Sequence, residues 1–121
     1  MAVCMLFASC GFFRAPGKDK CDKILPREQM TDILTDIYML EAFLREYQHF
    51  EPDFQDSIQY YYRALFDKHE VDKEVFEEAL NCYLLDRREI DIIHETMLNR
   101  LSLIESEIES KRRQAQEADA D

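Results

Sequence analysis

Cysteine, histidine and carboxylate side chains are the groups of this sequence that could bind a metal or take part in catalysis. The dipeptide His94-Glu95 begins like the HExxH zinc motif, but Leu98 stands where the second histidine is needed. No two cysteines are spaced as a CxxC pair, the arrangement common in zinc and thiol redox sites. The four cysteines are Cys4, Cys10, Cys21 and Cys82. We therefore expect no metal site and no cofactor.

Asp36 is the carboxylate with the most unusual predicted position, at the edge of the apolar face of a helix. A functional interpretation places it in a polar site with Tyr61, Tyr62 or His94. A structural interpretation, which we favour, pairs it with a tyrosine hydroxyl or with one of three arginines and fixes the helix register. Those arginines are Arg63, Arg87 and Arg88. Because spacing alone identifies no nucleophile and base, we expect no catalytic residue and no enzymatic activity.

Two further features suggest binding surfaces. Arg87 and Arg88 fall in the first turn of a predicted helix, where the helix dipole disfavours cations, so they require nearby carboxylates or an anionic partner. Tyr60, Tyr61 and Tyr62 are consecutive and span about 200° of a helix, so they cannot all face inward. Tyr60 is predicted to be exposed, which is common at protein interfaces and also ordinary for a lone tyrosine.

Cys10 is preceded by the apolar residues 2–8 and by the small pair Ala8-Ser9. This segment resembles a bacterial lipobox, in which the cysteine is acylated and the preceding peptide is removed. We interpret residues 1–9 as a signal-like segment and residues 10–24 as a flexible tether. The alternative is an apolar N-terminus with a chance cysteine. Cys82 is predicted to be a small core residue, with a disulfide to Cys21 as the alternative in an oxidising compartment.

Composition narrows the choice of partners and folds. The chain has 121 residues, is 46% hydrophobic and 34% charged, and carries a formal net charge of -11. An acidic chain is repelled by phosphate backbones, so nucleic acid is not an expected partner. Both glycines, Gly11 and Gly17, lie near the N-terminus, so the rest of the chain cannot form glycine-rich phosphate loops. The chain length and the hydrophobic fraction are sufficient for one domain with its own core.

Apolar spacings of three and four residues predict that residues 25–110 form a small all-α bundle of four helices, two long and two short. The first helix follows Pro26 and ends before residues 48–52, and the second runs from about Asp53 to His69. Asp72 and Asp86 are predicted to cap the third and fourth helices. Glu89, three residues after Asp86, would complete a capping box. Residues 111–121 are predicted to be a polar tail that frays.

Two positions carry further expectations. Glu70 lies between a helix end and a new cap, where a left-handed backbone favours glycine. On the fourth helix, Ile104 and Ile108 are expected either to pack on the first helix or to meet a second copy, which makes a homo-oligomer through the C-terminal helix an open alternative.

Matching residues along the two halves of the bundle resemble an uncharacterised bacterial lipoprotein family, domain of unknown function 4296 (DUF4296). In the first helix these are Pro26, Met30, Ile33, Leu34, Asp36, Glu41 and Ala42. Later ones are Lys68, His69, Val71, Phe76, Leu80, Tyr83, Ile93 and Leu101. The family tends to have glycine at Glu70 and tyrosine at Cys82 and at His94. The resemblance covers about 24–104 and implies a lipobox followed by a helical region, with no known catalytic residue.

Together these features favour a non-enzymatic helical protein of the cell envelope that is anchored in the membrane by a lipid at Cys10. We expect its body to bind another envelope protein and, because no acidic run follows Cys10, to face the periplasm. Alternatives are a periplasmic chaperone-like factor, a small enzyme using Asp36, Tyr61 or His94, and a cytosolic helical adaptor.

Overall fold

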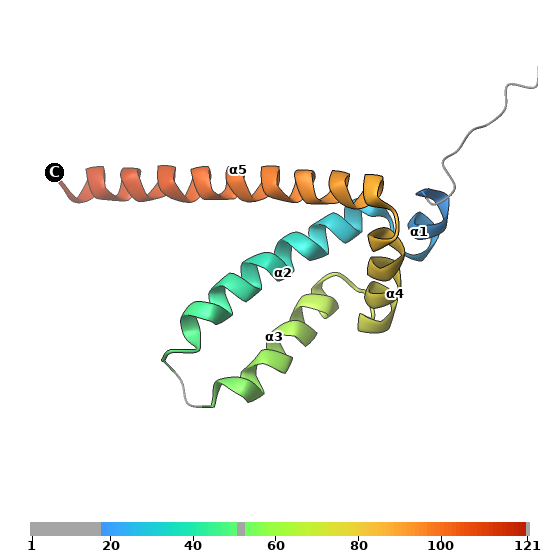
Figure 1. Ribbon diagram of the computed structural model, residues 1–121. Coiled ribbons are helices and arrows are strands. Elements are labelled where there is room, and N and C mark those ends of the chain that lie inside the picture. Colours follow the sequence, from blue (N-terminus) through green and yellow to red (C-terminus); the bar gives the residue numbers. More distant parts are fainter. Residues whose placement is uncertain (1–17, 51–52, 121) are drawn as a thin grey trace, which may run out of the picture.

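The computed structural model describes residues 18–50 and 53–120, and within them every regular element is a helix (Figure 1). The all-α class is confirmed, with five helices instead of four in this part of the chain. They are α1 (Lys18–Ile24), α2 (Arg27–Tyr47), α3 (Phe54–Lys68), α4 (Lys73–Leu84) and α5 (Arg87–Asp119). None of these helices is both long and apolar enough to cross a bilayer.

The helices pack around one core. In Figure 1, α2 and α3 run side by side as a hairpin, α4 crosses near the end of α3, and α5 starts beside α2 and then diverges from it. The short helix α1 packs against α4. Every helix contributes at least one side chain to the core. These include Cys21, Met30, Ile33, Phe66, Phe76, Tyr83 and Ile93.

Two boundaries differ from the sequence prediction. Residues 18–24, predicted as part of a flexible tether, form α1, and Cys21 within it is buried. The tail predicted to fray is helical as far as Asp119, so α5 has 33 residues and a length of about 50 Å. The proposed lipidation residue, Cys10, and the signal-like segment 1–9 lie outside the described residues.

Of the two predicted caps, the one at Asp86 is confirmed and the one at Asp72 is confirmed in position only. Both residues occupy the N-cap positions of α4 and α5, and the Asp86 carboxylate accepts a hydrogen bond from the Glu89 backbone N–H at 3.3 Å, but the Asp72 side chain makes no cap hydrogen bond. The reciprocal half of a capping box is not formed, because the Glu89 carboxylate binds Arg27 instead. Glu89 is therefore a buried ion-pair residue, 4% exposed.

Glu70 adopts the left-handed conformation that its position predicted, with φ of 54°. Its N–H donates to the carbonyl of Asp67, and the N–H of Val71 donates to the carbonyl of Phe66. This is the hydrogen-bond pattern of a Schellman motif, in which glycine is the usual left-handed residue. The Cβ of Glu70 is therefore a source of strain between α3 and α4.

Replacing Glu70 with glycine is expected to raise the free energy of unfolding by about 1 kcal/mol, because glycine takes a positive φ without a Cβ clash. Thermal or urea unfolding of Glu70→Gly measures this. Glu70→Ala is the matched control, since it removes the charge but keeps the Cβ, and it should give no such gain. A clear loss of stability in Glu70→Gly would contradict the argument.

Candidate functional site

The site residues predicted from sequence do not converge on one place. Asp36 lies on α2, the three tyrosines on α3, and Arg87, Arg88 and His94 on α5. Arg87, Arg88 and His94 are exposed, and within residues 18–50 and 53–120 none of them makes an ion pair. The carboxylate partners expected for the two arginines are therefore not found there.

Asp36 forms a polar cluster with residues that the sequence interpretation did not select. Its Oδ2 accepts a hydrogen bond from Lys68 Nζ at 2.8 Å and from His69 Nε2 at 2.7 Å. Neither the arginines nor the tyrosines proposed as its partners form a hydrogen bond or an ion pair with it in the described part of the chain. Partial burial raises the pKa of Asp36, but the hydrogen bonds and positive charge of Lys68 and His69 outweigh it, and the pKa lies below its ordinary value.

This cluster lines a shallow pocket between α2 and α5 of about 420 Å³. An ion pair between Asp32 and Arg100 forms another wall, and Leu103 and Ile104 provide apolar surface. The charged groups of the pocket are thus paired with one another. No cluster of three or more potential metal-ligating side chains occurs in the described part of the chain. This arrangement is suited to fixing α2 against the end of α3 and against α5.

We expect Asp36→Asn to lose about 1 kcal/mol of stability near neutral pH, because two charge-assisted hydrogen bonds at a partly exposed site weaken. A carboxylate with a lowered folded-state pKa stabilises the fold above its ordinary pKa of 3.8, and this contribution disappears as the pH falls through the folded value. The difference between the variant and the wild type should therefore be constant near neutral pH and shrink as the pH falls below 3.8. Urea unfolding between pH 7 and pH 3 tests this, with the exposed Asp91→Asn as control. A pH-independent difference would contradict it.

The three tyrosines have separate surroundings. Tyr60 is 70% exposed, as predicted, and its ring meets that of Tyr61 edge-on. Tyr61 also packs edge-on against Phe43 of α2, with ring centroids 5.9 Å apart. The Tyr62 hydroxyl donates to the carboxylate of Glu41 at 3.0 Å. Burial and this carboxylate raise the pKa of Tyr62, which keeps the phenol protonated.

A groove of about 1020 Å³ lies between α2, α3 and α4 (the α2–α4 groove). Apolar side chains form its floor, and the residues around them carry five carboxylates against two cationic groups. The apolar lining includes Leu34, Ile37, Ile58, Phe66, Phe76 and Leu80. The charged residues are Glu41, Asp67, Asp72, Glu74 and Glu77, with Arg63 and Lys73. An apolar floor with an acidic margin is suited to binding an amphipathic segment of another protein.

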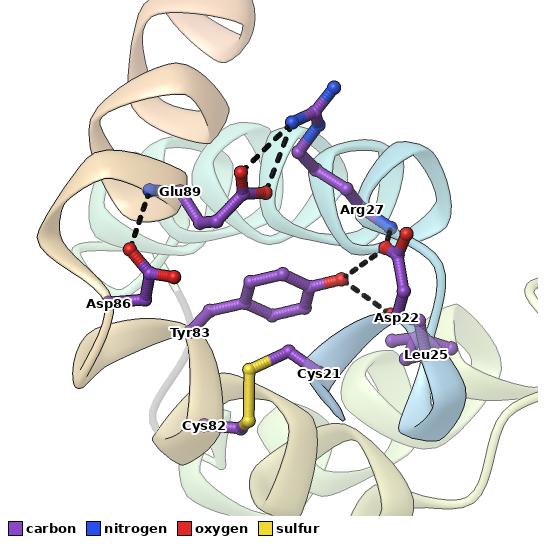
Figure 2. Close-up of a disulfide and its surroundings, with 8 residues drawn as sticks. All are labelled: Cys21, Asp22, Leu25, Arg27, Cys82, Tyr83, Asp86 and Glu89. Atoms are coloured by element: carbon purple, nitrogen blue, oxygen red, sulfur yellow. Dashed lines mark hydrogen bonds and ion pairs between the residues drawn. A yellow bond between two sulfur atoms is a disulfide. The ribbon is translucent and has the colours of Figure 1, made fainter. Parts of the chain in front are cut away.

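A disulfide between Cys21 and Cys82 fastens α1 to α4 (Figure 2). This corrects the expectation that Cys82 is a core thiol and confirms the alternative that the sequence left open. The buried Tyr83 hydroxyl donates to the Leu25 carbonyl at 2.7 Å and lies 2.9 Å from Asp22 Oδ1. Burial and the nearby Asp22 carboxylate strongly raise the pKa of Tyr83. Two adjacent residues of α4 therefore hold the same N-terminal segment.

Sequence reasoning missed the α2–α4 groove and the pairing of Glu89 with Arg27. The two residues of the ion pair are 62 positions apart in the sequence, and residues from α2, α3 and α4 line the groove. Local spacing therefore gives no signal for either feature. The only available signal for the α1 contact was the pair of cysteines.

Comparison with known proteins identifies one family. A family described as "Domain of unknown function (DUF4296)" matches residues 22–107, which is more than half of the chain and includes Cys82, the Asp36 cluster and the groove, whereas Cys21 lies one residue before the matched range. No curated protein and no solved structure matches the chain.

Proposed function

The chain belongs to the DUF4296 family, and from this premise we propose that it is a non-enzymatic, lipid-anchored protein of the cell envelope whose α2–α4 groove binds a segment of another envelope protein. The observation that carries the binding role is the groove itself, an apolar floor bordered by an excess of carboxylates. Specific protein segments are bound in such grooves by burying an apolar face while polar groups at the margin select the partner.

Two features support the envelope location. Cys10 follows small residues, as in a lipobox, and the Cys21–Cys82 disulfide is of a kind that persists in oxidising compartments such as the periplasm. The disulfide also bears on the cytosolic-adaptor alternative, because thiols in the cytosol are kept reduced.

The anchor and the groove would be held close together. Eight residues lead from Cys10 to the start of α1, so the distance between them cannot exceed about 29 Å. Because α1 is covalently linked to α4, a lipid on Cys10 would keep the groove close to the bilayer, where it would meet partners that are themselves attached to the membrane.

Anchoring is tested by metabolic labelling with a fatty-acid analogue. The wild-type chain should take up the label, and Cys10→Ala should not. Mass spectrometry should find the mature N-terminus at Cys10. An unmodified Cys10 with residues 1–9 still attached would refute the lipid anchor, while leaving the groove proposal to its own test.

Partner binding is tested by crosslinking in native membranes followed by purification. We expect a discrete adduct with the wild type that is lost in Tyr38→Lys, since Tyr38 lines the groove and is 54% exposed. Tyr60→Lys is the matched control, because Tyr60 is also an exposed tyrosine, at 70%, but lies outside the groove lining. If no adduct forms, or if both variants behave alike, the groove is not the binding surface.

The apolar floor also favours a second candidate, a periplasmic chaperone-like factor. Such a factor would suppress the aggregation of many unrelated unfolded proteins and would give a heterogeneous set of adducts. The dedicated-partner function predicts one stoichiometric adduct, so the same crosslinking experiment separates the two.

A further inference from the structure

The last turns of α5 leave the body of the protein. Figure 1 shows this helix continuing well past the region where it lies beside α2. From residue 105 to residue 120 every residue except Ser110 is exposed, and Ile108 is 56% exposed. We call residues 105–119 the α5 extension.

A helix of about this length is only marginally stable in water when nothing packs against it. The extension has one intrahelical ion pair, between Lys111 Nζ and Glu107 Oε1 at 2.9 Å, and such a pair contributes about 0.3–0.5 kcal/mol. It also keeps a large apolar side chain, Ile108, in contact with water. A packing partner would account for both features.

The charges of the α5 extension alternate in blocks. Glu105, Glu107 and Glu109 form an acidic block, and Lys111, Arg112 and Arg113 form the basic block that follows it. When two such helices lie antiparallel and cross between residues 109 and 110, each acidic block meets the basic block of the other helix. A parallel, in-register pair would instead place Lys111 against Lys111 of the second copy at a core position of the contact, which is unfavourable.

The apolar residues show the same self-complementarity. Leu101, Ile104 and Ile108 are followed at heptad spacings by Ala115 and Ala118. In the antiparallel arrangement Leu101 faces Ala118 of the second copy and Ile104 faces its Ala115, so that large side chains meet small ones. Ile108 faces Lys111 of the second copy, whose aliphatic stem can cover it. Leu101 and Ile104 are only partly covered by the body, which leaves surface for this contact.

From these observations we propose that the protein forms a homodimer in which the α5 extensions of two copies pack antiparallel. The shared contact runs from Leu101 to Ala118 along about 27 Å of helix. This contact leaves the α2–α4 groove of each copy open. Met97 is the α5 residue that lines the groove, and it precedes the shared contact. A dimer would therefore present two grooves, and its existence does not depend on the function proposed for them.

Sedimentation equilibrium of the full chain carrying Cys10→Ala, which prevents lipidation, tests the dimer. We expect a mass of twice 14.5 kDa, and association weakened at least tenfold in the triple variant Lys111→Glu/Arg112→Glu/Arg113→Glu. A second triple variant, Glu105→Lys/Glu107→Lys/Glu109→Lys, should also be monomeric. Mixing the two variants should restore a one-to-one dimer, since residues 105–113 then carry only acidic charges in one variant and only basic charges in the other.

Circular dichroism serves as the folding control, because all six substituted side chains are exposed and the body should keep its melting temperature. Orientation is tested with Leu101→Cys, which lies in the contact. In a parallel pair residue 101 faces its own copy and should form disulfide-linked dimers readily, whereas in the antiparallel pair the two copies of residue 101 lie about 25 Å apart and should not. A monomeric wild type, or mixed variants that stay monomeric, would overturn the proposal. Neither result would affect the crosslinking at Tyr38 that tests the groove.

Discussion

Replacing Cys82 with alanine is expected to lower the free energy of unfolding by about 4 kcal/mol. The disulfide to Cys21 closes a loop with a sequence separation of 61, and a crosslink of that span restricts the unfolded chain by about this amount. For a domain of this size such a loss is a large fraction of the total stability. Urea unfolding of the oxidised wild type and of Cys82→Ala, analysed with a common slope, measures it.

Three comparisons isolate the crosslink from other effects of the substitution. Cys21→Ala should cost about as much as Cys82→Ala, and a reductant should destabilise the wild type while leaving either variant unchanged. Asn81→Ala, an exposed neighbour on α4, should change stability by less than about 0.5 kcal/mol. A variant that unfolds at the wild-type urea concentration would show that the disulfide contributes no stability.

The disulfide also decides how firmly α1 is held. A helix of seven residues is too short to persist alone in water, so α1 depends on its contacts with α4. Without the crosslink the remaining links are apolar packing and the Tyr83 hydroxyl, which donates to the Leu25 carbonyl and lies 2.9 Å from Asp22 Oδ1. Without the disulfide, trypsin should therefore cleave after Lys20 and Lys23 before it cleaves the rest of the body.

Features set by neighbouring residues were predicted well from the sequence. The end of α2 at Tyr47, the cap at Asp86, the N-cap position of Asp72 and the left-handed Glu70 all depend on a few consecutive side chains and backbone sterics. The apolar periodicity of the four larger helices likewise reflects one face of each helix turning toward a common core.

Features set by distant residues were not predictable in the same way. The sequence offers Asp36 several possible cationic partners. The packing of α2 beside α3 brings Lys68 and His69 to it instead of Arg63. Residues 18–24 have a tether-like composition, and they are helical because a disulfide and Tyr83 fix this segment to α4. Local propensity carries no information about such long-range contacts.

Glu89 shows both kinds of information at one residue. Its position three residues after Asp86 correctly predicts that its N–H is capped, but its carboxylate does not turn back to the helix start. It faces Arg27 at the beginning of α2, with Nη1–Oε1 and Nη1–Oε2 distances of 3.3 and 3.0 Å (Figure 2). The local pattern is thus compatible with two partners for the carboxylate, the start of its own helix or a residue of another helix. Tertiary packing selects the second.

Removing Arg27 should consequently be costly. Arg27→Met leaves the carboxylate of Glu89, whose side chain is 6% exposed, without its cationic partner in a buried position. Breaking a buried pair in this way costs about 3–5 kcal/mol, and because the Arg27 side chain is 35% exposed we expect about 2–3 kcal/mol. Thermal and urea unfolding of Arg27→Met at neutral pH measures the loss.

The double variant Arg27→Met/Glu89→Leu distinguishes an unpaired buried charge from a simple loss of contact. If the stranded carboxylate is the cause, replacing it with an apolar side chain of similar size removes the desolvation cost, and the double variant should be more stable than Arg27→Met alone. Arg88→Met is the matched control, since Arg88 is exposed on α5 and should change stability by less than about 0.5 kcal/mol. If the losses in the free energy of unfolding from the two substitutions are additive, each side chain contributes independently through packing. In that case the ion pair between α2 and α5 does not hold the start of the two long helices together.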